Sequence, residues 1–158
     1  MTPVLVHHSR RIPVPPSTAF TSTIPIELPV LFDRWYGPIP PIREVRDQTG
    51  PWTTAGRRRT VFLTGGGSMQ EELTSVDDPA SFAYRLSGVT GAMAPLIDHI
   101  DGLWRFDDAG PGATTVTWSW TIHPRSALLR PAVVAFGRLW RGYAGRSLEQ
   151  LERLIATS

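Results

Sequence analysis

Three polar residues on consecutive predicted strands are the first candidates for contact with a ligand. Arg59 lies near the start of one strand, Glu72 on the strand after a glycine turn, and Tyr84 on the next. A turn centred near Gly66 places Arg59 opposite Glu72 or Leu73, and the first register allows an ion pair across the hairpin. A surface pair contributes only about 0–1 kcal/mol. In an apolar pocket the same groups would orient a bound molecule, so a structural and a functional interpretation both stay open.

A second candidate is His99, in the segment from Ile97 to Asp101. Alternation along a strand puts Asp98 and Ile100 on one face and His99 and Asp101 on the other. A histidine beside a carboxylate can act as a general base. A solvated strand edge is the commoner setting for such a group.

The remaining histidines do not form a metal-binding pattern. His7 and His8 are adjacent, so a strand would point them to opposite faces, and His123 lies far along the chain. Neither an HxxxH nor an HExxH spacing occurs. We therefore expect no metal and no cofactor.

The composition excludes several kinds of chemistry. The chain has no cysteine, which rules out disulfides, thiolate metal ligands and a cysteine nucleophile. All 16 basic residues are arginine, so a catalytic lysine or a lysine Schiff base is ruled out as well. The net charge is only +2, and the densest basic cluster spans just residues 57–59. Nucleic-acid binding is not expected, because it usually needs a sustained basic face.

Length and hydropathy indicate one domain over residues 1–158. The chain has 41% hydrophobic and 19% charged residues, as is normal for globular proteins. No apolar run approaches the roughly eighteen residues that a membrane-spanning helix needs. The first residues lack the basic-then-apolar order of a signal peptide, so we expect a cytoplasmic protein.

Turns rich in Gly, Pro and Asp divide most of the chain into seven predicted strands. The first covers residues 4–14. Residues 17–31 favour two short helices, because Pro25 and Pro29 would interrupt a continuous one. Six strands follow at intervals of about a dozen residues, which is typical of an antiparallel meander. They cover residues 42–48, 57–64, 68–76, 81–89, 94–107 and 113–123.

One long helix is predicted from Ser126 to Thr157. Ser126 is the expected N-cap, and Pro131 favours either a start near residue 130 or a bend. Glycines at positions 137, 142 and 145 indicate close approach of the sheet or clearance for a ligand. The apolar residues form one stripe on this helix: Leu129, Val133, Phe136, Trp140, Tyr143, Leu148, Leu151 and Ile155.

The last predicted strand has one wholly apolar face. Its apolar residues alternate with threonine and serine, which turns Trp118 and Trp120 toward the helix. Neighbouring indoles on a concave sheet can form solid core or the wall of an apolar pocket, and the architecture favours the pocket. The predicted apolar walls are Phe82, Tyr84, Trp104, Val116, Trp118, Trp120, Phe136 and Trp140.

The order of one strand, two short helices, six strands and a long helix resembles the START-like, or SRPBCC, helix-grip superfamily. This superfamily includes polyketide cyclase/dehydrase and lipid-transport proteins. The segments AGRRRTV, GGGSMQEELTSVDDPASFAYRL, DGLWRFDDAGPGATTVTWSWTIHP and LEQLERL are similar to its members. The resemblance implies an α+β fold, with a curved seven-stranded antiparallel sheet wrapped around the C-terminal helix. It also implies a hydrophobic ligand between helix and sheet, and places Arg59, Glu72 and Tyr84 at recurring polar positions without a catalytic role.

Three functions follow as hypotheses. In the first, residues 1–158 form one START-like domain that binds a small lipid-, aromatic- or polyketide-like molecule in a cavity. In the second, a polyketide aromatase/cyclase or dehydratase enolises a β-ketone in that cavity, although no His or Lys base is predicted on the inner face. In the third, the protein is a regulatory protein-interaction module without an open cavity. A homodimer is compatible with each.

Overall fold

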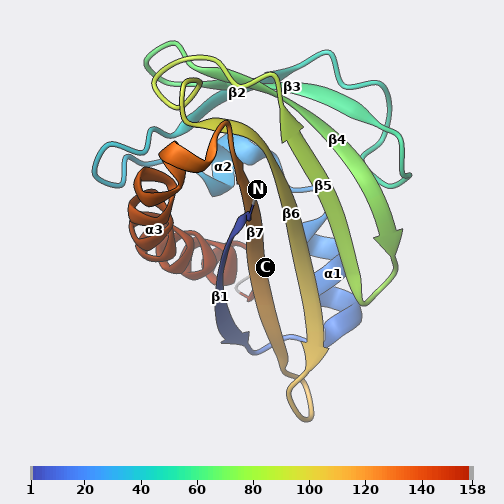
Figure 1. Cartoon of the computed structure of the whole chain (residues 1–158). Helices are drawn as coiled ribbons and strands as arrows, with labels where there is room; N and C mark the ends of the chain where they lie inside the picture. The colour runs from blue at the N-terminus through green and yellow to red at the C-terminus, as the bar shows by residue number, and fades with distance from the viewer. Residues whose placement is uncertain (1, 157–158) are drawn as a thin grey trace.

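The computed structural model describes residues 2–156 and consists of one curved sheet, a long C-terminal helix and two short helices (Figure 1). Seven antiparallel strands are arranged in the order β1-β7-β6-β5-β4-β3-β2. This confirms the predicted helix-grip fold. The strands are β1 (Val4–Ile12), β2 (Ile42–Arg46), β3 (Arg58–Leu63), β4 (Ser68–Asp77), β5 (Ser81–Ser87), β6 (Ile97–Asp108) and β7 (Thr114–Pro124).

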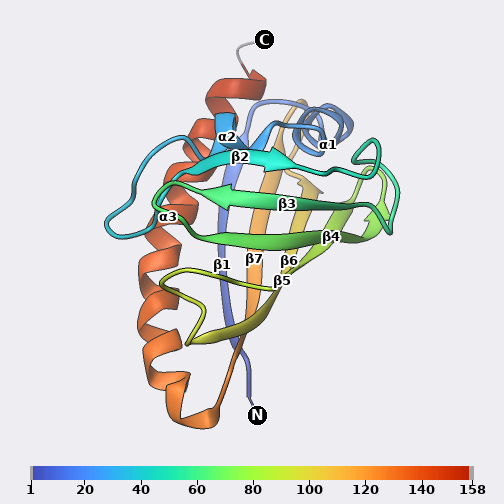
Figure 2. The ribbon, with the colours of Figure 1, turned by 90° about the horizontal axis from the view of Figure 1, so that it is seen from above.

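The helices lie on the concave side of this sheet. α3 (Arg130–Ala156) packs mainly on β1, while α1 (Pro16–Thr23) and α2 (Leu28–Leu31) follow β1 in the chain. Figure 2 shows β2, β3 and β4 running across the direction of β1 and β7, so the sheet curls around the space beside α3. Within residues 2–156, no helix is both long and apolar enough to span a membrane.

The start of α3 differs from the predicted cap. A short 3-10 turn (Ala127–Leu129) separates Ser126 from α3, which begins at Arg130. The Ser126 side chain makes no capping hydrogen bond, so that prediction is wrong. The backbone supplies the contact instead, since the Leu129 amide donates to the Ser126 carbonyl oxygen. The predicted last residue of the helix, Thr157, lies outside the described residues.

The glycines of α3 mark places where other elements approach the helix closely. A Cβ at Gly137 would lie 2.8 Å from Val6 Cγ1, and one at Gly145 would lie 3.3 Å from His8 Nε2. At position 142 a Cβ would overlap the hydroxyl of Tyr36. Of the two explanations offered by the sequence, the contacts support close approach.

Strand alternation places the aromatic residues as expected. Trp118 of β7 is 2% exposed and faces the fully buried Trp140 of α3, with ring centroids 4.9 Å apart. Phe82, Tyr84 and Leu86 of β5 are all buried on the same inner face. These residues form a core that continues from the sheet into the helix.

In β6, His99 and Asp101 share a face as predicted, but the predicted shared face of Asp98 and Ile100 is wrong. A bulge lies between Ile97 and His99, so both Ile97 and Ile100 point into the core. Asp98 is exposed and does not share the face of Ile100. A bulge inserts an extra residue and shifts the alternation, which the residue pattern alone did not indicate.

Candidate functional site

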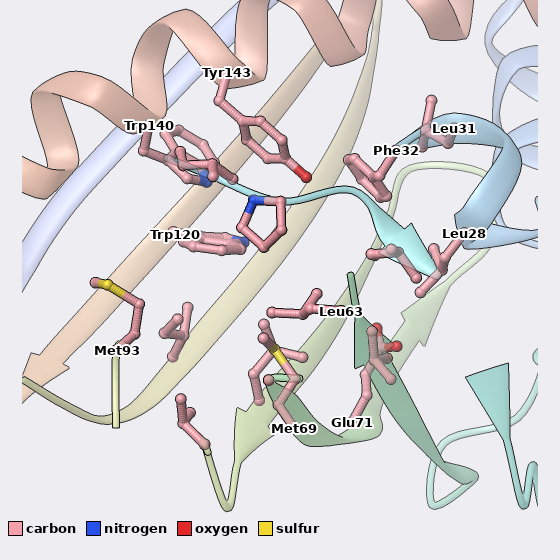
Figure 3. A pocket seen from close by; sticks show the side chains of 18 of the residues that line it. Leu28, Leu31, Phe32, Leu63, Met69, Glu71, Met93, Trp120, Trp140 and Tyr143 are labelled. Carbon is pink, nitrogen blue, oxygen red and sulfur yellow. The ribbon is translucent and has the colours of Figure 1, made fainter. Parts of the chain in front are cut away.

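A cavity of about 370 Å³ lies between the concave sheet and α3 (Figure 3). Trp140 and Tyr143 of α3 border it on one side, and Met69 and Glu71 of β4 border it on the other. Trp120 of β7 lies between them. A volume of this size falls within the range of small-molecule sites, which are mostly apolar with a few placed polar groups.

Eight of the ten predicted site residues border this cavity. They are Arg59, Phe82, Tyr84, Trp104, Trp118, Trp120, Phe136 and Trp140. The other two predicted residues do not. Val116 is fully buried in the core, and Glu72 points to the outer face, where it accepts a hydrogen bond from Arg58. Ligand binding by these residues stays a prediction.

The hairpin register decides which carboxylate faces the cavity. β3 and β4 pair so that Arg59 is opposite Glu71 and Arg58 is opposite Glu72. Phe62 pairs with Ser68, so the turn is centred one residue earlier than predicted. The predicted Arg59–Glu72 pair is therefore wrong, because a shift of one residue moves a side chain to the other face.

Arg59 and Glu71 form a buried ion pair at one end of the cavity. Arg59 Nε donates to Glu71 Oε1 over 2.7 Å, and their side chains are 7% and 5% exposed. The Arg59 guanidinium carbon also lies 3.8 Å from the ring centroid of Trp52, within the range of a cation–π contact. The sequence analysis missed both Glu71 and Trp52.

The buried position of Glu71 changes its acidity. Burial raises the pKa of the Glu71 carboxyl, and the charge and hydrogen bond of Arg59 only partly offset this effect. The ionisable groups that border the cavity in the described chain are Arg59, Glu71, Tyr84 and Tyr143. Glu71 is therefore the one carboxyl among them that could take up and release a proton inside the cavity.

Tyr84 is held by two indoles. Trp118 Nε1 and Trp120 Nε1 each donate a hydrogen bond to its hydroxyl oxygen over 2.8 Å. A tyrosine hydroxyl accepts through two lone pairs and donates one proton. Both acceptor positions are filled, and within residues 2–156 the proton meets no acceptor. Burial, together with the negative charge of Glu71, raises the pKa of Tyr84, so the hydroxyl remains a donor.

A second donor at the cavity wall also lacks a partner. The Nε1 atom of Trp140 is buried and makes no hydrogen bond with the described residues. Tyr143 lies beside it on α3, where its ring stacks on Phe32 with centroids 5.9 Å apart. The cavity therefore has aromatic walls and two hydrogen-bond donors, the Tyr84 hydroxyl and Trp140 Nε1, that have no acceptor among the described residues.

The family model for polyketide cyclase/dehydrase and lipid transport matches residues 3–156. No curated protein matches the sequence significantly. The structure is similar to that of Ara h 8.0201, with a TM-score of 0.69, 15% identity and 99% of both chains covered. It is also similar to norcoclaurine synthase from Thalictrum flavum in complex with dopamine and hydroxybenzaldehyde. That TM-score is 0.74, at 12% identity, covering 99% of this chain and 88% of the other.

At these identities the solved structures support the fold alone, which is the Bet v1-like helix-grip arrangement. The family model carries more weight, because it spans nearly the whole described chain. From this match, the protein belongs to the polyketide cyclase/dehydrase and lipid transport family.

Proposed function

We propose that this protein binds a small, flat hydrophobic molecule that carries a carbonyl or similar oxygen, of the aromatic or polyketide-like type. The observation that carries the proposal is the Tyr84 hydroxyl, which accepts two hydrogen bonds and whose proton has no acceptor among residues 2–156. A ligand oxygen would accept this hydrogen bond in a site where an unmade bond is costly. Residues 1–158 would act as one ligand-binding domain.

The aromatic walls favour flat rings over an acyl chain. Trp104 and Trp118 are stacked with centroids 5.0 Å apart and planes 11° apart, and Phe82 stacks on Trp104. Such surfaces gain additional energy from offset stacking with a planar ligand. The aromatic ligands named with norcoclaurine synthase are consistent with this class.

Fluorenone and fluorene form a matched pair of probes, because they share a planar skeleton and only the first carries a carbonyl. Each would be titrated into the protein and followed by quenching of tryptophan fluorescence and by calorimetry. We expect fluorenone to bind about 2–10-fold more tightly, which corresponds to one neutral hydrogen bond. In Tyr84→Phe the two affinities should become equal.

Tyr36→Phe is the control, since its hydroxyl lies against Gly142 rather than in this cavity. It should retain the preference for fluorenone. Saturable binding of palmitate without binding of either ring compound would contradict the aromatic class and favour a lipid. Folded protein that binds none of the three would contradict the proposal and favour the interaction module.

The raised pKa of Glu71 favours a second candidate function, the enolisation of a ketone during cyclisation or dehydration. Its carboxylate would remove a proton next to the carbonyl, and the Arg59 guanidinium would stabilise the resulting oxyanion. Deuterium exchange into the methyl group of acetophenone, followed by NMR, tests this step. We expect exchange above the buffer rate, lost in Glu71→Gln and retained in Glu72→Gln. Exchange at the buffer rate in all three proteins would contradict this activity.

Two further expectations belong to the proposal. A cytoplasmic location and a homodimeric state are both consistent with a carrier or enzyme of this size, and both stay predictions. Light scattering after size-exclusion chromatography would measure the oligomeric state.

A further inference from the structure

Two histidines that are far apart in the sequence lie side by side on the outer face of the sheet. His99 and His123 are direct partners across β6 and β7. Their imidazole rings stack with centroids 4.0 Å apart and planes 13° apart. The adjacent Ile100 and Ile122 are buried on the inner face. The histidines therefore face away from the ligand cavity, and this cluster is independent of the proposed function.

Asp101 completes a group of three converging side chains. Its Oδ2 atom lies 3.2 Å from His123 Nε2 and 3.8 Å from His99 Nε2. One ligand atom from each of the three residues lies within 4.8 Å of the other two. In a tetrahedral zinc site, with bonds of about 2.0–2.2 Å, neighbouring ligand atoms are about 3.4 Å apart. The two separations from Asp101 Oδ2, 3.2 Å and 3.8 Å, are close to this value.

Asp98 orients the His99 ring, as a second carboxylate commonly does for a histidine that binds a metal. Asp98 Oδ2 lies 2.7 Å from His99 Nδ1. A carboxylate can only accept here, so the Nδ1 atom carries the proton and the lone pair is on Nε2, toward Asp101. A carboxylate behind a histidine is the usual support of a metal-binding imidazole.

Arg85 orients the Asp101 carboxylate through hydrogen bonds. Its Nε donates to Asp101 Oδ1 over 2.8 Å and its Nη2 donates to Oδ2 over 3.4 Å, while Oδ2 is also the atom that faces both histidines. The guanidinium therefore orients the whole carboxylate, and Oδ2 also lies beside the histidine pair.

We propose that His99, Asp101 and His123 form a binding site for a divalent transition-metal ion, with Zn²⁺ as the best fit. Imidazole nitrogen with one carboxylate suits zinc and its neighbours in the first transition row better than Mg²⁺ or Ca²⁺, which prefer oxygen. The side chains are 24%, 37% and 31% exposed, so water can fill the remaining coordination position. Asp98 and Arg85 would position the ligands.

Metal binding requires two local changes. His123 Nε2 lies 3.2 Å from Asp101 Oδ2, so by the same reasoning it carries the proton of that ring, and a metal ion bound at this atom displaces that proton. The second change is in the orientation of the rings. A metal ion lies in the plane of each imidazole that binds it, and two parallel stacked rings do not share such a point. One ring must therefore rotate about its χ2 angle to direct its lone pair at the ion. Both rings are partly exposed, and this torsion is broad for histidine.

Calorimetric titration of Zn²⁺ into chelator-treated, tag-free protein tests the site. We expect one saturable site per chain, weakened at least tenfold in the double variant His99→Ala/His123→Ala. The double variant His7→Ala/His8→Ala removes the same number of imidazoles from exposed positions of β1 and should bind like the wild type. Asp98→Ala should weaken binding about 10–100-fold, as expected for a supporting carboxylate.

A folding control and a Co²⁺ spectrum distinguish loss of the metal site from loss of the fold. Circular dichroism and urea unfolding report whether each variant is folded. If the double variant fails to fold, Asp98→Ala still tests the site, because it changes only one exposed side chain. Substituting Co²⁺ should give a visible d–d absorption that is lost in His99→Ala/His123→Ala and retained in His7→Ala/His8→Ala. No saturable Zn²⁺ binding by the folded wild type would overturn the proposal. Equal Zn²⁺ affinity in all folded variants would overturn it as well.

Discussion

The ring of Tyr84 lies on the Cα atom of Gly102, its partner across β5 and β6. A Cβ at position 102 would overlap the ring. The absence of a side chain there lets the phenol lie flat against β6 and brings its hydroxyl between two indoles of β7. The donor that the proposed function depends on is therefore positioned by a glycine on a neighbouring strand.

Gly102→Ala should displace the Tyr84 ring and destabilise the protein. Overpacking of a core position typically costs about 1–3 kcal/mol, and we expect a loss in this range in urea unfolding. The fluorenone preference should fall with it, because the hydroxyl leaves its position. In a Tyr84→Ala background the same substitution should cost little. A full cost in that background would show that the ring is not the obstacle.

Arg59→Met should strongly destabilise the protein at neutral pH. It leaves the Glu71 carboxylate buried without its charge partner, and breaking a buried pair in this way costs about 3–5 kcal/mol. Arg58→Met removes the partner of Glu72 at the surface, where the two side chains are 72% and 41% exposed, and should cost less than about 1 kcal/mol. Arg59→Met/Glu71→Met should recover most of the loss in urea unfolding. Equal costs at positions 58 and 59 would contradict the buried pair.

The stability of the protein should depend on pH through Glu71. Because its pKa is raised above the ordinary value of 4.5, the folded protein keeps a proton that the unfolded chain releases. This contribution is complete below pH 4.5 and is lost as the pH rises through the raised pKa. The wild type should therefore lose stability relative to Glu71→Gln across that range, measured by urea unfolding at several pH values.

A comparison with Glu71→Gln is needed because other carboxyls act in the opposite direction. The hydrogen bond from His99 lowers the pKa of Asp98, so its contribution is lost as the pH falls. That contribution is common to both proteins and cancels in the difference. A difference between wild type and Glu71→Gln that stays constant with pH would contradict a raised Glu71 pKa.

Two glycines of α3 should respond in opposite directions to the same substitution. Gly145→Ala meets only the tip of the exposed His8 ring, so it should stabilise the helix by up to about 1 kcal/mol. Gly137→Ala meets the buried Cγ1 of Val6, which cannot move aside, and should lower the free energy of unfolding by about 1–2 kcal/mol. Thermal and urea unfolding measure both, and a gain at position 137 would contradict close packing of β1 on α3.

The sequence alone was sufficient for the architecture and for most of the cavity wall. Alternation in β7 and the stripe on α3 placed Trp118 and Trp140 on inner faces, since the two periodicities are local properties of the chain. The same reasoning put Phe82 and Tyr84 on one inner face. It could not show that the Tyr84 hydroxyl receives both indole N–H groups, because the contact joins β5 to β7 across the intervening strand β6.

Tertiary structure decided the features that depend on register and on pairing between distant segments. Moving the hairpin centre by one residue replaced Glu72 with Glu71 at the cavity, because adjacent residues of a strand face opposite sides. The bulge in β6 moved Asp98 off the inner face and beside His99. No local pattern in the sequence indicates that His99 lies beside His123. The two rings meet because β6 pairs with β7 and because the bulge in β6 sets the register of that pairing.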